Sequence, residues 1–236
     1  MIEVTGLTVR FGGVTPLDAM SVQFPGGTCG LIGPNGAGKT TFFNVLSGFV
    51  SPAAGGVRAF GDDLLAMANY RRARWGLRRT FQTEQAIEAL SVFDNVALVH
   101  EHSGGRRAVR REEVLDALTF VGLEVDPRER VGTLGARERR LVEIARAVVG
   151  RPRVVLLDEP AAGLPDEETG HLAEVIRRIP EHTGALAILV DHDMSLVSAC
   201  CATTAVLDFG KLIASGPTAA VLRDDAVIRA YLGVDS

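Results

Sequence analysis

One glycine-rich stretch decides how this chain folds, Gly33-Pro34-Asn35-Gly36-Ala37-Gly38-Lys39-Thr40-Thr41. It fits the phosphate-binding pattern G-x-x-x-x-G-K-[ST], and an apolar strand at residues 29–32 leads into it. Its three glycines let the backbone amides turn inward around a triphosphate, and the helix that begins near Lys39 adds the positive end of its dipole. The pattern predicts that Lys39 contacts the β- and γ-phosphates and that the Thr40 hydroxyl holds Mg²⁺.

Lysine is rare in this chain, because Lys39 and Lys211 are the only two among 25 basic residues. A lysine inside the glycine-rich loop therefore indicates a need for a compact ammonium, which a planar guanidinium does not replace. The alternative interpretation is an ordinary glycine-rich turn between a strand and a helix. The complete strand, loop and helix context argues against that alternative.

Length and composition indicate one α/β domain with an inserted subdomain, since 236 residues with 47% hydrophobic content bury a full core. The longest aliphatic run, residues 185–190, is too short to span a bilayer, and no basic leader segment is visible. We therefore expect a soluble, cytoplasmic protein. Cys29, Cys200 and Cys201 have no metal-ligand spacing and are expected to be small buried hydrophobic residues.

Charge is unevenly distributed, because the chain has a net charge of −4 while residues 71–151 hold more arginines than carboxylates. This asymmetry is typical of either an interaction face or a solvated helical surface. Nucleic acid is a poor candidate partner, since the whole chain is acidic and has no basic stripe interleaved with aromatic residues.

A second apolar run, residues 154–157, ends in Asp158-Glu159-Pro160. Continuous apolar strands are buried on both faces, which favours a parallel central sheet. Carboxylates at such a strand end lie at the sheet edge where ligands bind, and a phosphate site needs a carboxylate for Mg²⁺. The alternative is an ordinary transition from strand to loop. A similar strand, residues 185–190, is closed by Asp191-His192-Asp193.

The remaining pattern predicts an N-terminal β-hairpin over residues 2–24, with Phe11 at its tip. The Phe11 ring is expected either to stack on an adenine or to pack inside the hairpin. Helices are predicted at residues 91–102, with Ser91 as N-cap, and at 106–121, 137–149 and 166–179. His100 and His102 are expected to be solvated rather than to bind a metal.

The order of these features resembles the ATP-binding subunit of ATP-binding cassette (ABC) transporters over nearly the whole chain. This resemblance implies an α/β fold of the phosphate-loop NTPase class, with a mostly parallel central sheet, an N-terminal antiparallel β subdomain and an inserted helical subdomain. The catalytic core would be residues 1–85 and 151–236, and the helical subdomain residues 86–150. ATP and Mg²⁺ are the implied cofactors, with residues 33–41 and Phe11 binding the nucleotide.

The resemblance also implies roles for four further residues. Gln82 would contact the nucleotide and Mg²⁺ and sense the membrane partner, while Asp158 would hold the metal through water. Glu159 would polarise the attacking water, and His192 would touch the γ-phosphate. Thr40, Gln82 and Asp158 thus form the expected metal set, and Glu159 and His192 the expected catalytic pair.

A narrower likeness lies in Arg79-Thr80-Phe81-Gln82 and in residues 159–164, 192–194 and 207–211. These segments are similar to the ATPases of importers for branched-chain amino acids and related small polar solutes such as amides or urea. The resemblance implies a peripheral protein on the cytoplasmic face of the membrane, bound to permease subunits and served indirectly by a solute-binding protein.

Two segments depart from the family pattern. The signature L-S-x-G-Q falls on Leu134-Gly135-Ala136-Arg137-Glu138, so its serine and its second glycine are missing, and Pro165 replaces a usual aspartate or asparagine. In the family both segments serve a nucleotide on the other subunit, which favours an asymmetric heterodimer with a second ATPase subunit. The alternatives are a regulatory cassette with little hydrolysis and a soluble ABC ATPase without a transport role.

Overall fold

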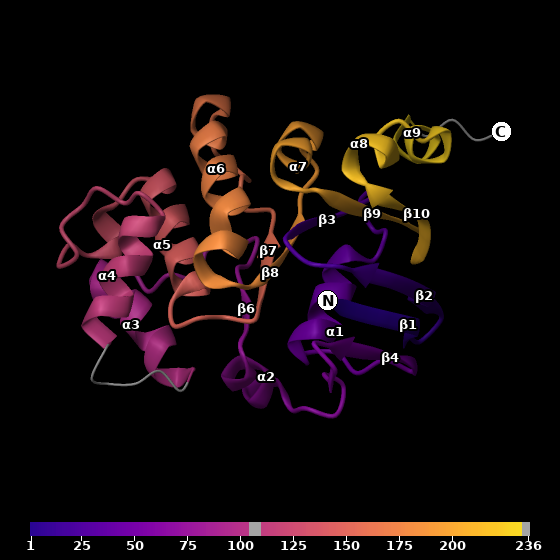
Figure 1. Cartoon of the computed structure of the whole chain (residues 1–236), viewed down its shortest axis with the longest axis horizontal. Helices are drawn as coiled ribbons and strands as arrows, with labels where there is room; N and C mark the ends of the chain where they lie inside the picture. Colours follow the sequence, from indigo (N-terminus) through magenta and orange to yellow (C-terminus); the bar gives the residue numbers. More distant parts are fainter. Residues whose placement is uncertain (104–109, 233–236) are drawn as a thin grey trace.

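The computed structural model describes residues 1–103 and 110–232, whose strands form two sheets (Figure 1). The larger sheet holds, in spatial order, β10 (Lys211–Pro217), β9 (Thr203–Asp208), β3 (Thr28–Ile32), β8 (Leu186–Val190), β7 (Val154–Asp158) and β6 (Leu77–Arg79). The smaller sheet holds β2 (Val14–Phe24), β1 (Ile2–Phe11), β4 (Ala54–Ala59) and β5 (Asp62–Asp63).

Parallel pairing runs through the larger sheet from β9 to β6. Of its described strands, only β10 is antiparallel to its neighbour. Every residue of β3, β7 and β8 is buried, as strands covered on both faces require. The prediction of a mostly parallel central sheet is confirmed.

The smaller sheet is antiparallel and contains the predicted N-terminal hairpin of β1 and β2. Phe11 pairs with Val14 across the turn at the hairpin tip. The Asp18 amide of β2 donates a hydrogen bond to the Gly210 carbonyl, at 3.0 Å. The hairpin is therefore fastened to the turn between β9 and β10, beside the larger sheet.

Helices and the smaller sheet cover the two faces of the larger sheet. On one face, Val154 and Leu156 of β7 join a core with α1 (Lys39–Ser47) and the smaller sheet. On the other face, Val155 and Leu157 join a core with α6 (Asp166–Thr183) and α7 (Met194–Cys200). The alternation of β7 side chains thus divides the interior into two cores.

Three helices form a separate group on the left of Figure 1, and they are α3 (Val92–His102), α4 (Arg110–Phe120) and α5 (Ala136–Val148). Ser91 caps α3 as predicted, because its Oγ accepts a hydrogen bond from the Asp94 amide. The predicted helix over residues 106–121 corresponds to α4, and residues 106–109 lie outside the described part.

His100 is fully buried, so the prediction of a solvated side chain was wrong for this residue. Its Nε2 lies 2.5 Å from Glu113 Oε2 of α4. The physical reason is helical spacing, because His100 follows buried Val96 by four residues and continues the same face of α3. His102 lies two residues further round the helix and is exposed, as predicted.

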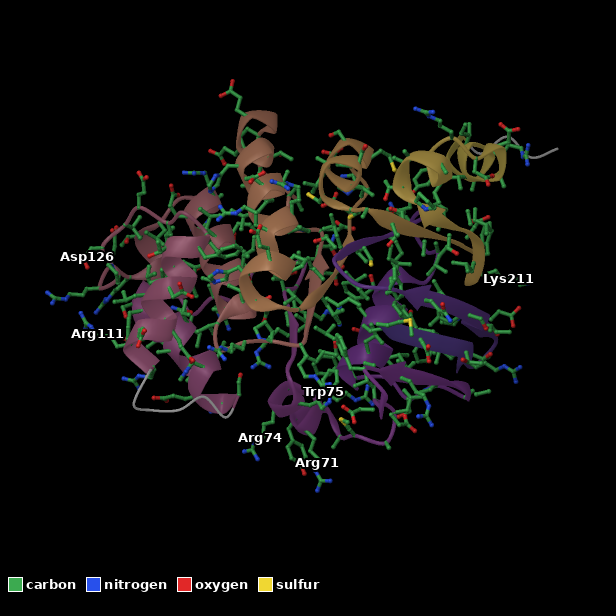
Figure 2. All side chains as sticks on the ribbon, viewed as in Figure 1. Arg71, Arg74, Trp75, Arg111, Asp126 and Lys211 are labelled. Atoms are coloured by element: carbon green, nitrogen blue, oxygen red, sulfur yellow. The ribbon has the colours of Figure 1, made fainter. Side chains whose placement is uncertain are left out.

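The arginine-rich region divides into surface and interior residues. Figure 2 shows Arg71 and Arg74 of α2 (Asn69–Trp75) projecting away from the molecule, and Arg111 projecting from α4. Arg72, by contrast, is buried and donates to the Val45 and Leu46 carbonyls near the end of α1. Part of the positive excess therefore satisfies helix termini in the interior rather than forming a surface.

The C-terminal segment carries α8 (Thr218–Val221) and α9 (Asp225–Leu232). In the described ranges, every helix is either too short or too polar to cross a membrane. Cys29, Cys200 and Cys201 are free and buried, as predicted, and burial raises the pKa of the Cys200 thiol to about 12.

Candidate functional site

The predicted site residues follow the carboxyl ends of four adjacent parallel strands. The phosphate loop follows β3, and the next three strands in the sheet, β8, β7 and β6, lead to His192, Glu159 and Gln82. The Glu159 amide donates to the Val190 carbonyl at 2.8 Å, which holds the ends of β7 and β8 together. Ligands of open parallel sheets bind at this edge.

The phosphate loop turns so tightly that two of its positions accept only glycine. A Cβ at Gly33 would lie 2.1 Å from the Leu207 carbonyl oxygen, and one at Gly38 would lie 2.3 Å from the Pro16 carbonyl oxygen. Both glycines have positive φ, 150° and 106°. Because α1 begins directly after Gly38, its first-turn amides have no partners within the helix and are available to an anion.

Lys39 is buried inside this loop, with 8% of its surface exposed. Its Nζ donates to the carbonyl oxygens of Gly33, at 2.6 Å, and Pro34, at 3.0 Å. Burial lowers the pKa of the ammonium, while the charges of Glu159 and Asp158 oppose that shift. Both carboxylates at the end of β7 therefore favour the charged form of Lys39.

Gln82 and His192 both face Glu159. Gln82 Nε2 donates to Glu159 Oε2 at 3.0 Å, and His192 Nδ1 lies 4.0 Å from the same oxygen. Glu159 adopts a positive φ of 46°, a strained conformation for a residue with a side chain and one that clusters at functional sites. His192 is 69% exposed and is therefore open to a ligand in front of Glu159.

Asp191, directly before His192, is almost fully buried and borders this group. Its Oδ1 accepts a hydrogen bond from the Asp193 amide and lies 3.6 Å from His192 Nδ1. Burial raises the pKa of the Asp191 carboxyl, and the hydrogen bond from Asp193 works against that shift.

Asp158 and Thr40 are the residues that suit a magnesium ion. Asp158 is 5% exposed, and its Oδ2 accepts a hydrogen bond from Arg79 Nη2 at 2.8 Å. Thr40 is an exposed residue in the first turn of α1. Carboxylate, hydroxyl and amide oxygens are the hard ligands that Mg²⁺ takes. Among the described residues no three His, Cys, Asp or Glu form a metal cluster, so the ion would depend on phosphate oxygens and water.

Phe11 lies at the tip of the β1–β2 hairpin with 54% of its surface exposed. This exposure contradicts the alternative in which the ring packs inside the hairpin. A largely free aromatic face is suited to stacking on a nucleotide base.

Residues 134–138, the segment predicted to correspond to the family signature, lie at the start of α5, and β6 and β7 separate α5 from α1 in Figure 1. Leu134 is buried, Gly135 is the N-cap and Ala136 is the first helical residue. The Arg137 guanidinium is 38% exposed and lies 3.9 Å from Glu138 Oε1, a weak contact within the segment. These residues lie with α3, α4 and α5, and not at the strand ends beside the loop that contains Lys39.

Two interior contacts were not predicted from the sequence. One is the Arg79–Asp158 pair. The other is a buried pair on α5, in which Arg140 Nη1 lies 2.9 Å from Glu143 Oε2. Glu143 Oε1 also accepts the Gln85 amide at 2.6 Å and so ties α5 to the segment after Gln82. The i, i+3 spacing of Arg140 and Glu143 was a signal that a charge-pair search would have found.

Comparisons with known proteins agree with this geometry. A family model described as ABC transporter matches residues 17–162, and a model for the branched-chain amino acid ATP-binding cassette transporter matches residues 211–236. The high-affinity branched-chain amino acid transport ATP-binding protein BraF of Pseudomonas aeruginosa is 34% identical, covering 99% of this chain and 98% of the relative. LivG of Salmonella typhimurium, which carries the same description, is 36% identical with the same coverage.

Among solved structures, the ADP conformation of MJ1267, an ATP-binding cassette of an ABC transporter, has a TM-score of 0.86 and 24% identity. It covers 99% of both chains, and at this identity it supports the fold alone. The family model spans more than half of the chain, and the relatives match it over nearly their full length. This chain therefore belongs to the ABC transporter family, as one of its ATP-binding ATPase subunits.

Proposed function

We propose that this chain is the ATP-hydrolysing subunit of an importer for branched-chain amino acids or a related small polar solute such as an amide or urea. The observation that carries the proposal is the convergence of Lys39, Asp158, Glu159 and His192 at adjacent strand ends, in a chain whose full-length relatives BraF and LivG are named for branched-chain amino acid transport. The subunit would lie peripherally on the cytoplasmic face of the membrane, bound to permease subunits. A solute-binding protein would deliver the solute to those permease subunits.

The proposed domain organisation follows the packing of the elements. Residues 1–85 and 151–236 would form the catalytic core, and residues 86–150 the helical subdomain. In support, α3, α4 and α5 contact one another and contribute side chains to a shared apolar cluster. The contact of Glu143 with the Gln85 amide lies at the proposed junction of the two units.

The triphosphate of ATP would occupy the loop of residues 33–41, with Phe11 stacking on the adenine. Lys39 would exchange its carbonyl partners on Gly33 and Pro34 for β- and γ-phosphate oxygens, because a charge-assisted bond to phosphate is stronger than one to a neutral carbonyl. Thr40, Gln82 and, through water, Asp158 would hold Mg²⁺. The ion would neutralise charge that develops on the phosphate oxygens.

Glu159 would orient and deprotonate the attacking water, since its carboxylate lies against Gln82 and His192 at the strand ends. Its hydrogen bond from Gln82 must then open or rearrange, which makes Gln82 a link between the membrane partner and the water. His192 lies 4.0 Å from Glu159 Oε2 and is largely exposed, so it would contact the γ-phosphate without a large backbone movement. Phosphoryl transfer of this kind depends mainly on positioning and charge stabilisation.

The dimer is proposed to be asymmetric. The groups that this chain would supply to its own nucleotide are all present, whereas the segments that it would lend to a partner's nucleotide are altered at Gly135, Arg137 and Pro165. A homodimer would carry the altered signature at both sites. We therefore expect a second, different ATPase subunit whose regular signature completes the site built on Lys39, while the opposite site turns over little.

Steady-state ATPase assays of the isolated chain over a wide concentration range test this asymmetry. The expected result is ATP binding with weak hydrolysis that does not rise steeply with protein concentration, because a productive homodimer does not form. In the competing account Arg137 replaces the lost glycine amide with a charged contact and keeps both sites active. Strong, concentration-dependent hydrolysis by the pure chain would establish that account and refute the asymmetric dimer.

Uptake assays test the transport role. Cells that lack the gene are complemented either with the wild-type chain or with Glu159→Gln, and labelled leucine and labelled urea are supplied in parallel. We expect the wild-type chain alone to restore uptake of one of the two solutes. Equal uptake of both solutes with and without the gene contradicts the proposed cargo classes.

A further inference from the structure

We propose that Arg79 is a positioning residue for the magnesium-dependent step, holding the Asp158 carboxylate in place against the helix that carries Lys39 and Thr40. The inference rests on the proposed function and adds to it a residue outside the expected metal set. Arg79 is the last residue of β6 and precedes Gln82 by three positions.

The guanidinium of Arg79 bridges two parts of the site. Its Nη2 donates to Asp158 Oδ2 at 2.8 Å, and its Nη1 donates to Asn44 Oδ1 of α1 at 2.7 Å. The side chains of Arg79 and Asp158 are 5% and 6% exposed, so water scarcely screens the pair. The two terminal nitrogens of one guanidinium thus connect Asp158, at the end of β7, to α1, the helix that follows the phosphate loop.

Two aromatic rings confine the same guanidinium. Its central carbon lies 4.8 Å from the ring centroid of Phe81 and 5.4 Å from that of Phe43. Phe43 belongs to α1, and Phe81 directly precedes Gln82. Because the rings restrict the side chain, the position of Arg79 is coupled to the segment that carries Gln82.

This arrangement leaves Asp158 with one oxygen engaged and the other oriented by that engagement. A buried carboxylate without a partner is strongly destabilising, so without Arg79 the Asp158 carboxylate would leave the position in which the structure holds it. Asp158 would then no longer face the water shell of Mg²⁺, an ion that demands near-ideal octahedral geometry.

The test separates metal-dependent from metal-independent nucleotide binding. A non-hydrolysable fluorescent ATP analogue is titrated onto the isolated full chain, first in EDTA and then with increasing Mg²⁺, for the wild type and Arg79→Met. We expect Arg79→Met to raise the half-saturating Mg²⁺ concentration roughly tenfold to a hundredfold, the usual effect of losing a partner of a metal ligand. Affinity in EDTA should stay at the wild-type value, because the phosphate loop is unchanged.

Two further variants grade the effect. Arg79→Lys keeps the charge but does not bridge Asn44 and Asp158 at once, so its shift should be intermediate. Asn44→Ala removes only the second anchor of Arg79 and should give the smallest shift in the same direction. If Arg79→Met does not fold, these two variants decide the proposal, and a wild-type Mg²⁺ midpoint in both overturns it.

Arg78→Met is the matched control, because Arg78 is the neighbouring buried arginine and, within residues 1–103 and 110–232, its hydrogen bonds go to the backbone carbonyls of Ala73 and Leu77. It should leave the Mg²⁺ midpoint unchanged, and an equal shift in both variants would show a general packing effect and overturn the proposal. An unchanged or lowered midpoint in Arg79→Met would do the same. Failure of the proposed function looks different, because then wild-type binding itself does not respond to Mg²⁺.

Discussion

The strand-end cluster around Lys39 and residues 134–138 at the start of α5 are organised in opposite ways. In the first, three charged groups have hydrogen-bond partners within the chain. Lys39 donates to two carbonyls, Asp158 accepts from Arg79, and Glu159 accepts from Gln82. In the second, the one ion pair of Arg137 among the described residues is a distant contact with Glu138, and the guanidinium is partly exposed.

This difference indicates where each region meets its ligand. A cluster that is already satisfied in the isolated chain is preorganised, and ATP binding has only to exchange its partners. The Arg137 side chain, 38% exposed at the start of α5, is accessible to a partner subunit. Variants of the first region should therefore change the behaviour of the isolated protein, whereas variants near α5 should leave nucleotide binding intact.

The largest effect is expected from Glu159→Gln. An amide does not accept the proton of the attacking water, so turnover of the complete dimer should fall by about 10²- to 10⁴-fold. ATP affinity should be unchanged, because Glu159 lies beyond the phosphate loop. Steady-state ATPase rates and nucleotide titration measure the two quantities separately. Glu181→Gln, an exposed carboxylate on α6, is the control for the change in charge, and turnover of Glu159→Gln equal to that of this control would remove Glu159 from the mechanism.

Lys39→Ala should have the next largest effect, and it acts on binding rather than turnover. Losing one charge-assisted contact costs about 1.5–3 kcal/mol, or roughly tenfold to a hundredfold in ATP affinity. Nucleotide titration of the isolated chain measures it. The chain offers a matched control in Lys211→Ala, since Lys211 is the only other lysine and pairs with Asp18 at the surface. Equal losses in both variants would indicate a general charge effect and not a phosphate contact.

The positions of the strand-end residues were predictable from the sequence because they obey local rules. A glycine-rich loop before Lys39 and carboxylates after an apolar strand each have a short, recognisable pattern. The parallel order of the strands then brings Glu159 and His192 to the same edge without further information. Ser91 was predicted equally well, because an N-cap is a local feature.

The partners of these residues depended on tertiary register and were missed. Arg79 pairs with Leu156 in the β6–β7 ladder, and Asp158 lies two residues beyond Leu156 on the same face of β7. The Arg79 guanidinium reaches the Asp158 carboxylate because β6 lies next to β7 in the sheet. No local sequence pattern predicts that β6 and β7 are neighbours. His100 was misassigned for a different reason, because its four-residue spacing from Val96 already placed it on the buried face of α3.

The smallest expected effect, that of Ser91→Ala, is the sharpest test of the contrast between the regions. Ser91 Oγ accepts the Asp94 amide and donates to Asp94 Oδ2, so its loss uncaps α3 and should cost about 0.5–2 kcal/mol of folding free energy. For a chain of this size each kcal/mol corresponds to a fall in Tm of roughly 2–4 °C. Thermal unfolding measures the loss, and Ser91→Thr, which keeps the hydroxyl, should recover most of it. ATP affinity should match the wild type in both variants, because α3 supplies no group to the phosphate loop. If ATP affinity falls together with Tm, the stability of α3, α4 and α5 is coupled to nucleotide binding at the strand-end cluster. The two regions would then differ in their contacts but not in their response to mutation.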